Sequence, residues 1–193
     1  SCGQDDFFLG RVVHAAPAAP PAAGPALGSV SRDTLTTTLA AAGAITRAAS
    51  EPDARVKEYK VKAALLLNFL KYAKFPAGTF PNDRSPIKVL IIGDDPFGPI
   101  LKRTLGKKEV RGRSIQIVRI RKQPKTIDAQ LVFASGLNKA ERASLIKSLK
   151  NKPTILVGEA AGFAEAGAFI NLFMRKGKVR FEINSARLKS TKV

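Results

Sequence analysis

Apolar residues that recur every three or four positions predict the first ordered element of the chain. They indicate an amphipathic helix over residues 56–74, with an inward stripe formed by Val61, Ala64, Leu65, Asn68, Phe69 and Tyr72. Most lysines of the segment, Lys62 among them, are expected on the other faces. Pro76 ends the helix, because proline cannot donate the next backbone hydrogen bond.

Short apolar runs closed by turn residues predict the strands that follow. They cover residues 87–93, 114–120, 129–135 and 154–158. Helices are expected between them, one ending near Leu105 and one over residues 141–150, and residues 168–184 read as two strands joined at Lys176 and Gly177. This alternation predicts an α/β fold: a single three-layer domain with a mostly parallel sheet and a C-terminal β-hairpin.

The composition changes before this domain. Residues 15–28 are rich in alanine and proline, and residues 34–50 resemble a weak secretory signal or a frayed helix. We therefore interpret residues 1–55 as a disordered, flexible tail or a degenerate targeting segment, and residues 56–193 as the domain. Lipidation of Cys2 stays open. Deleting residues 1–50 is expected to leave the melting temperature unchanged.

Charge and composition limit the possible functions. The formal net charge is +18, and it divides into −1 for residues 1–55 and +19 for the remainder. Such a basic domain favours acidic proteins, nucleic acid or anionic lipid as partners. With one cysteine and one histidine, Cys2 and His14, both outside the expected core, the chain offers no zinc cluster and no histidine-based catalytic triad. No apolar run is long enough to span a membrane.

Four segments, in order, carry a resemblance to a known family. They are VKAALLLNFLKYAKFP (61–76), IKVLIIGDDPFG (87–98), RGRSIQIVRI (111–120) and GFAEAGAFINLFMRKGKVRFEIN (162–184). Together they resemble the YfiR-like periplasmic regulators over roughly residues 56–184. The resemblance implies a non-enzymatic repressor that binds the sensor region of a membrane diguanylate cyclase, and so limits cyclic di-GMP and biofilm formation. It also implies a periplasmic location, although a signal peptide is not clearly present in this chain.

Three departures from the family pattern bear on this expectation. Phe75 stands where the family commonly has tryptophan, and Ala129 stands where members often carry cysteine, so redox control through a disulfide is not expected here. The segment after the FEIN motif, residues 185–193, is short. That shortness puts in doubt any partner contact made by this tail.

Two strand-to-helix junctions suggest a ligand cleft. Asp94, Asp95 and Phe97 follow the first strand, whereas Gly162 and Phe163 follow the strand at 154–158. If the two strands are parallel, both junctions lie at the same edge of the sheet, where α/β proteins bind ligands. Helix capping by the aspartates is the simpler interpretation. No catalytic residue, metal site or cofactor is assigned.

The densest positive charge lies between residues 102 and 125. We take its centre as the candidate partner-binding surface: Arg111, Arg113, Arg119, Arg121 and Lys122. The expected partner is a membrane-bound signalling protein, a diguanylate cyclase or a sensor kinase, with an acidic periplasmic domain. Membrane contact is expected only through that partner, and a homodimer stays open. The alternative is a basic nucleic-acid-binding module, disfavoured because aromatic residues do not alternate with the charges.

Overall fold

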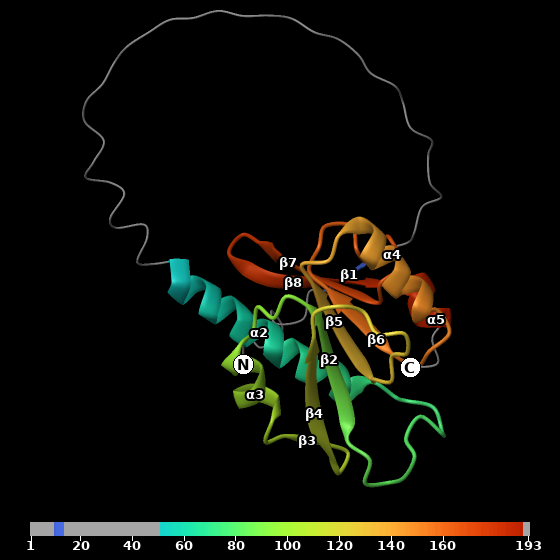
Figure 1. Ribbon diagram of the computed structural model, residues 1–193. Helices are drawn as coiled ribbons and strands as arrows, with labels where there is room; N and C mark the ends of the chain where they lie inside the picture. Colours follow the sequence, from blue (N-terminus) through green and yellow to red (C-terminus); the bar gives the residue numbers. More distant parts are fainter. Residues whose placement is uncertain (1–9, 14–50, 191–193) are drawn as a thin grey trace, which may run out of the picture.

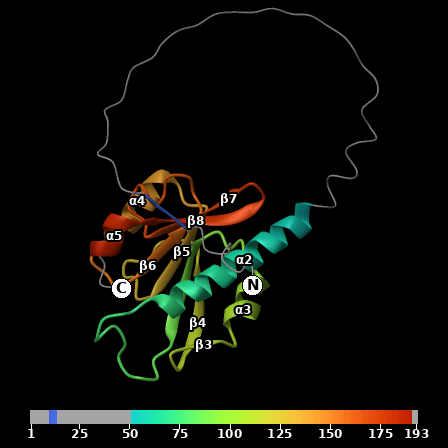
Figure 2. The same ribbon diagram turned by 180° about the vertical axis from the view of Figure 1, so that it is seen from behind.

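The computed structural model describes residues 10–13 and 51–190, which form three layers around one sheet (Figure 1). The long helix α2 (Glu51–Tyr72) and the short α3 (Pro99–Leu105) cover one face, and α4 (Lys139–Ser148) covers the other. A last short helix is α5 (Ser185–Ser190). Figure 2 shows α2 running diagonally across the sheet from behind. The fold class predicted from the sequence, a single three-layer α/β domain, is confirmed.

The sheet contains eight strands in the order β1-β8-β7-β6-β5-β2-β4-β3. Their bounds are β1 (Gly10–Val13), β2 (Ile87–Gly93), β3 (Glu109–Val110), β4 (Arg113–Ile120), β5 (Leu131–Ser135), β6 (Ile155–Gly158), β7 (Ile170–Arg175) and β8 (Lys178–Asn184). Pairing is parallel except for the β7–β8 hairpin and the β3–β4 pair. The mostly parallel sheet and the C-terminal hairpin therefore match the sequence prediction.

Side chains that alternate along the central strands fill two cores. Val89 and Ile91 of β2 point toward α2, where Leu66 is fully buried, whereas Leu90 and Ile92 point toward α4 and its buried Leu145. A strand buried on both faces explains the continuous apolar run IKVLIIG. The core on one face is filled from α2 and α3, and the core on the other face is filled from α4.

The rotation of α2 differs from the sequence prediction. The predicted inward residues Val61 and Tyr72 are 41% and 73% exposed, and Ala64 is exposed as well. The buried stripe is instead Tyr59, Lys62, Ala63, Leu66, Leu67, Leu70 and Ala73. The prediction was wrong because it assigned lysine to solvent, whereas Lys62 lies in the stripe and is only 3% exposed.

The N-terminal boundary also differs from the prediction. Helix α2 begins at Glu51, so the ordered segment starts before residue 56. Within the segment interpreted as tail, Gly10–Val13 forms β1, which pairs in parallel with Phe181–Asn184 of β8. Residues 1–9 and 14–50, with the proposed targeting segment and Cys2, lie outside the described residues.

We predict that β1 contributes measurably to stability, contrary to the expectation for the 1–50 deletion. Removing residues 1–13 would uncover the edge of β8, whereas removing residues 1–9 leaves the β1 pairing intact. The longer truncation should lower Tm by about 3–6 °C relative to the shorter one, because about 1 kcal/mol corresponds to a few degrees at this size. Thermal unfolding followed by circular dichroism measures the difference. Equal Tm values would show that β1 adds no stability.

Candidate functional site

The carboxyl ends of β2, β5 and β6 meet at one edge of the sheet. The order of the strands reverses at β2. The chain passes from β2 to β4 on one side of it and then crosses to β5 on the other side, while β2 and β5 stay parallel. Such a switch point is where open α/β sheets usually bind ligands. Here the crevice is narrow: Asp94 N–H donates to the Ser135 carbonyl oxygen at 3.0 Å, and a side chain at Gly93 would meet that oxygen at 2.0 Å.

The two aspartates after β2 have structural partners. Asp95 Oδ1 accepts hydrogen bonds from the backbone N–H groups of Phe97 and Gly98, at 3.0 and 3.2 Å. Its Oδ2 accepts from Arg119 Nε at 2.6 Å. Asp94 is exposed and packs against Gly136. Asp95 therefore organises the loop before α3. The capping interpretation was wrong, because Gly98 occupies the N-cap of α3 and no side chain caps that helix through a hydrogen bond.

The structure does not bring Phe97 and Phe163 together in one cleft. Phe97 is buried on the α2 side, in edge-to-face contact with Tyr59 and Phe133. Phe163 is buried on the α4 side, where its ring lies against Gly158. Gly162 is exposed in the turn after β6, directly before Phe163, and it lines neither of the hollows described below. Both rings serve as core residues on opposite faces of the sheet.

A buried ionic cluster fills the crevice instead. Lys62 Nζ, on α2, lies 2.6 Å from Glu159 Oε2 and 2.5 Å from Glu58 Oε1. Tyr59 donates its hydroxyl hydrogen to Glu159 Oε2 at 3.1 Å, and Ser135 donates to Oε1 at 2.7 Å. Glu159 thus joins helix α2 to the ends of β5 and β6, and each of its oxygens is hydrogen-bonded.

Burial and charge act together on the groups in this cluster. Burial tends to lower the pKa of Lys62, but hydrogen bonds to Glu159 and Glu58 outweigh it and the pKa is raised. Burial, followed by the negative charge of Glu159, raises the pKa of Tyr59. The lysine is therefore held protonated and the tyrosine neutral, which is the state that keeps the cluster bonded.

Sequence analysis missed all five members of this cluster. Lys62 and Tyr59 lie three residues apart on a helix whose rotation was predicted wrongly, and Glu159 was not singled out as a site residue. The usable signal was the carboxylate directly after β6, together with Ser135 at the end of β5. In a parallel sheet both positions face the same edge.

The four arginines predicted to bind a partner fall into two kinds. Arg113 donates to the carbonyl oxygens of Asn82 and Ser85, and its guanidinium stacks 4.1 Å from the centre of the Phe80 ring. Arg119 is paired with Asp95 and also donates to the Gly98 carbonyl oxygen. Both hold loops of the domain in place, so they are not simple exposed charges.

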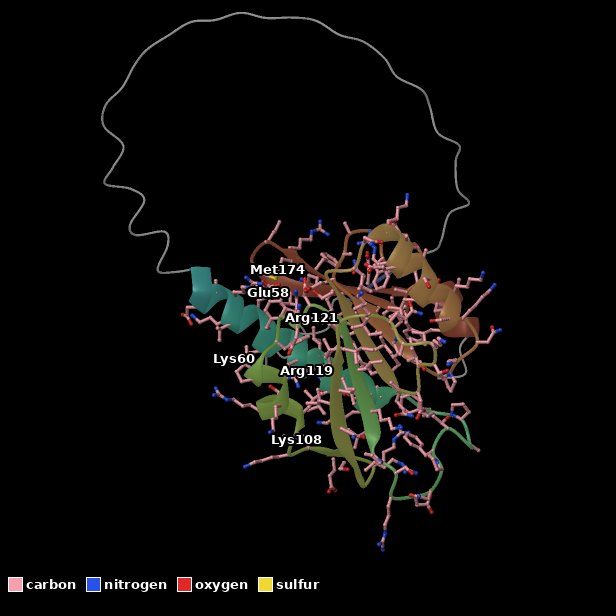
Figure 3. All side chains as sticks on the ribbon, in the orientation of Figure 1. Glu58, Lys60, Lys108, Arg119, Arg121 and Met174 are labelled. Carbon is pink, nitrogen blue, oxygen red and sulfur yellow. The ribbon has the colours of Figure 1, made fainter. Side chains whose placement is uncertain are left out.

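Arg111 and Arg121 are different. Arg111 is exposed and donates a long hydrogen bond of 3.5 Å to the Lys71 carbonyl oxygen. Arg121 and Lys122 are exposed, and neither forms a salt bridge with any described residue. Arg111 comes just before β4 and Arg121 just after it, and the strand itself spans about 23 Å at about 3.3 Å per residue. The charges form a stripe along β4, and Figure 3 shows Lys108, Arg119 and Arg121 spread along that side.

Two hollows lie away from the predicted cleft. A groove of about 1040 Å³ lies between the first turns of α2 and the β7–β8 hairpin, with apolar residues that include Val61, Met174 and Val179. Its basic rim includes Arg55 and Arg180. The second hollow, about 470 Å³, is bordered by Arg111, Arg113 and several other residues, among them Phe75 and Phe80.

Within residues 10–13 and 51–190, no three His, Cys, Asp or Glu side chains are grouped so that they could hold a metal ion. In the same residues, no helix combines the length and the apolar character needed to cross a membrane.

Comparison with known proteins gives one family. The model of the YfiR/HmsC-like family matches residues 59–193, which is most of the chain and includes α2 from Tyr59 onward and every member of the ionic cluster except Glu58. No curated protein matches the sequence. The matched region begins at Tyr59, the first residue of the buried stripe on α2.

We predict that the ionic cluster makes folding stability fall at alkaline pH. The pKa of Lys62 is raised in the folded state. Its contribution to the free energy of unfolding is therefore complete below the unfolded pKa of about 10.4 and is lost as the pH rises through the folded pKa. Tyr59 acts in the same direction. Urea unfolding of the wild type between about pH 8 and pH 11 should show this loss, and it should be smaller in Lys62→Met. An identical pH dependence in the variant would contradict the assignment.

We also predict that replacing the two kinds of arginine has different effects on the free energy of unfolding. Arg113→Glu with Arg119→Glu should lower the free energy of unfolding by about 2 kcal/mol or more, because loop contacts and the Asp95 pair are lost. The matched pair Arg111→Glu with Arg121→Glu makes the same charge change and should cost about 0.5 kcal/mol or less. Equal losses would show that Arg113 and Arg119 are ordinary surface charges.

Proposed function

The chain belongs to the YfiR/HmsC-like family, and we propose from this premise that it is a regulatory protein of the periplasm. In this proposal it binds the sensor region of a membrane-bound signalling protein, a diguanylate cyclase or a sensor kinase, and represses it. Family membership is the observation that carries the proposal. The matched family is regulatory rather than catalytic and is linked to diguanylate cyclases.

The crevice chemistry supports a non-enzymatic role. A catalytic acid or base must reach a substrate proton, directly or through one water. Glu159 has both oxygens bonded within the protein, and Lys62 has a side chain only 4% exposed between two carboxylates. These groups hold α2 against the sheet, and they form their hydrogen bonds with one another and with Tyr59, Ser135 and Glu58.

The surface supports recognition of a protein. The domain carries an excess of positive charge, while the groove beside the hairpin exposes apolar side chains such as Val61 and Met174, 41% and 45% exposed. Apolar area surrounded by charge is typical of sites where proteins bind one another. A module for single-stranded nucleic acid would use aromatic side chains for stacking, and Phe80 is already stacked against Arg113.

We predict that binding to a cyclase sensor domain is accelerated by charge. The association rate with the purified periplasmic domain of a membrane diguanylate cyclase should fall about tenfold or more as salt rises from about 50 to about 500 mM, with a smaller change in dissociation. Surface plasmon resonance measures both rates. Arg111→Glu with Arg121→Glu should slow association in the same way, since neither residue supports the fold.

A cellular measurement tests repression separately. Directing the chain to the periplasm of a host that carries the cyclase should lower intracellular cyclic di-GMP. Tighter binding to duplex DNA than to the sensor domain at physiological salt would favour the nucleic-acid alternative and contradict the proposal. The Arg111→Asp, Arg121→Lys variant is a useful control, because it reverses only the charge at one end of β4.

A further inference from the structure

The two edges of the sheet differ in how far the last strand covers its neighbour. At one end β1 lies along β8 and covers Phe181–Asn184. At the other, β3 pairs with β4 only at Ser114 and Arg113, through a turn in which Arg111 and Gly112 both have positive φ, 52° and 72°. Beyond Ser114, residues 115–120 of β4 have no strand beside them on the outer side among the described residues.

Backbone pairing shows which groups point outward. In a parallel pair, a residue that bonds to its neighbour turns both its N–H and its C=O to that side. Lys88 of β2 accepts from Gln130 N–H at 3.0 Å, so even-numbered residues of β2 face β5 and odd-numbered residues face β4. Val89 lies opposite Ile117, so its backbone groups bond to Gln116 and Val118, the residues on either side of Ile117. Ile117 turns its own N–H and C=O outward.

The same alternation applies to the rest of the strand. The backbone N–H and C=O groups point away from β2 at Ile115, Ile117 and Arg119. Arg113 points its backbone groups to the same side, where it pairs with Val110 of β3. No described backbone group accepts from their N–H groups. Next to this edge, Gln116 and Val118 are exposed on the α4 side of the sheet. The edge therefore offers both a row of hydrogen-bonding groups and apolar contact.

Charge decides which occupant fits. A second copy placed edge to edge would bring its own Arg119, Arg121 and Lys122 against an equally basic strand, and like charges across a pair are destabilising. Positive residues at an edge are a usual protection against self-pairing. The same residues attract a strand of opposite sign. Lys102, Arg103, Lys107 and Lys108, on α3 and just after it, are also exposed and extend the positive side.

We propose that the outer edge of β4 binds an extended acidic segment of the partner protein as an added strand. This inference rests on the proposed function for the identity of the partner, and it names the surface and the mode of binding. Outward backbone groups of Ile115, Ile117 and Arg119 supply the pairing. Arg121 and Lys122 at one end and Arg111 at the other bind the acidic side chains.

The test uses the full chain and a synthetic peptide of about nine residues that alternates glutamate with valine or threonine. Two variants are compared: Ile117→Pro removes the outward N–H and leaves the β2 ladder intact, whereas Ile117→Ala loses the same side chain but keeps the N–H. Fluorescence titration should show binding to the wild type and to Ile117→Ala. Affinity for Ile117→Pro should be at least about fivefold weaker than for Ile117→Ala, since a lost hydrogen bond costs about 1 kcal/mol.

Hydrogen exchange gives a reading that needs no variant. Saturating peptide should slow exchange at the amides of Ile115, Ile117 and Arg119, with no comparable change at the amides of Gln116 and Val118, which already bond to β2. A lysine-for-glutamate version of the peptide should not bind. Absence of peptide binding, or equal affinities of the two Ile117 variants in folded protein, would overturn the proposal.

A final comparison separates this proposal from the proposed function. If the cyclase sensor domain binds the wild type and both Ile117 variants equally, the regulator function stands and the β4 edge is not its binding surface. If the sensor domain does not bind but the peptide does, the edge accepts acidic strands and the identity of the partner is wrong.

Discussion

Everything in this domain depends on one buried contact, the pairing of Lys62 with Glu159. A lysine in the core is costly unless its charge is compensated, and removing one partner of such a pair is far more damaging than replacing both. Here the carboxylate comes from the end of β6 and the ammonium from the middle of α2. The helix can therefore lie on the sheet in only one rotation. The apolar contacts of Leu66 and Leu70 then follow from that rotation.

This contact also explains which parts of the structure the sequence could predict. Strand β2 was predicted with its observed bounds, because a continuous apolar run closed by glycine is a local signal. The hairpin turn at Lys176 and Gly177 is equally local. The rotation of α2 is not, since Lys62 reads as a surface residue until Glu159, nearly one hundred positions later, is brought beside it.

The candidate site shows the same limit. The carboxyl edge of the sheet was correctly expected to gather Asp94, Asp95 and the turn after β6. The faces of the sheet on which Phe97 and Phe163 lie depend on how each loop turns, and no spacing in the sequence encodes that. Likewise, nothing local distinguishes Arg113 and Arg119 from Arg111 and Arg121. Their roles are set by Phe80 and Asp95, which arrive from other segments.

The unequal ends of the sheet have a consequence for self-assembly. A sheet with two free edges can grow into a fibre, because each added copy presents a new edge to the next. In this chain β1 is the last strand at one edge of the sheet, and the β4 edge repels an identical edge through like charge. Assembly through two β4 edges is therefore opposed by charge, and a strand of opposite sign that joins at β4 becomes the new last strand of the sheet.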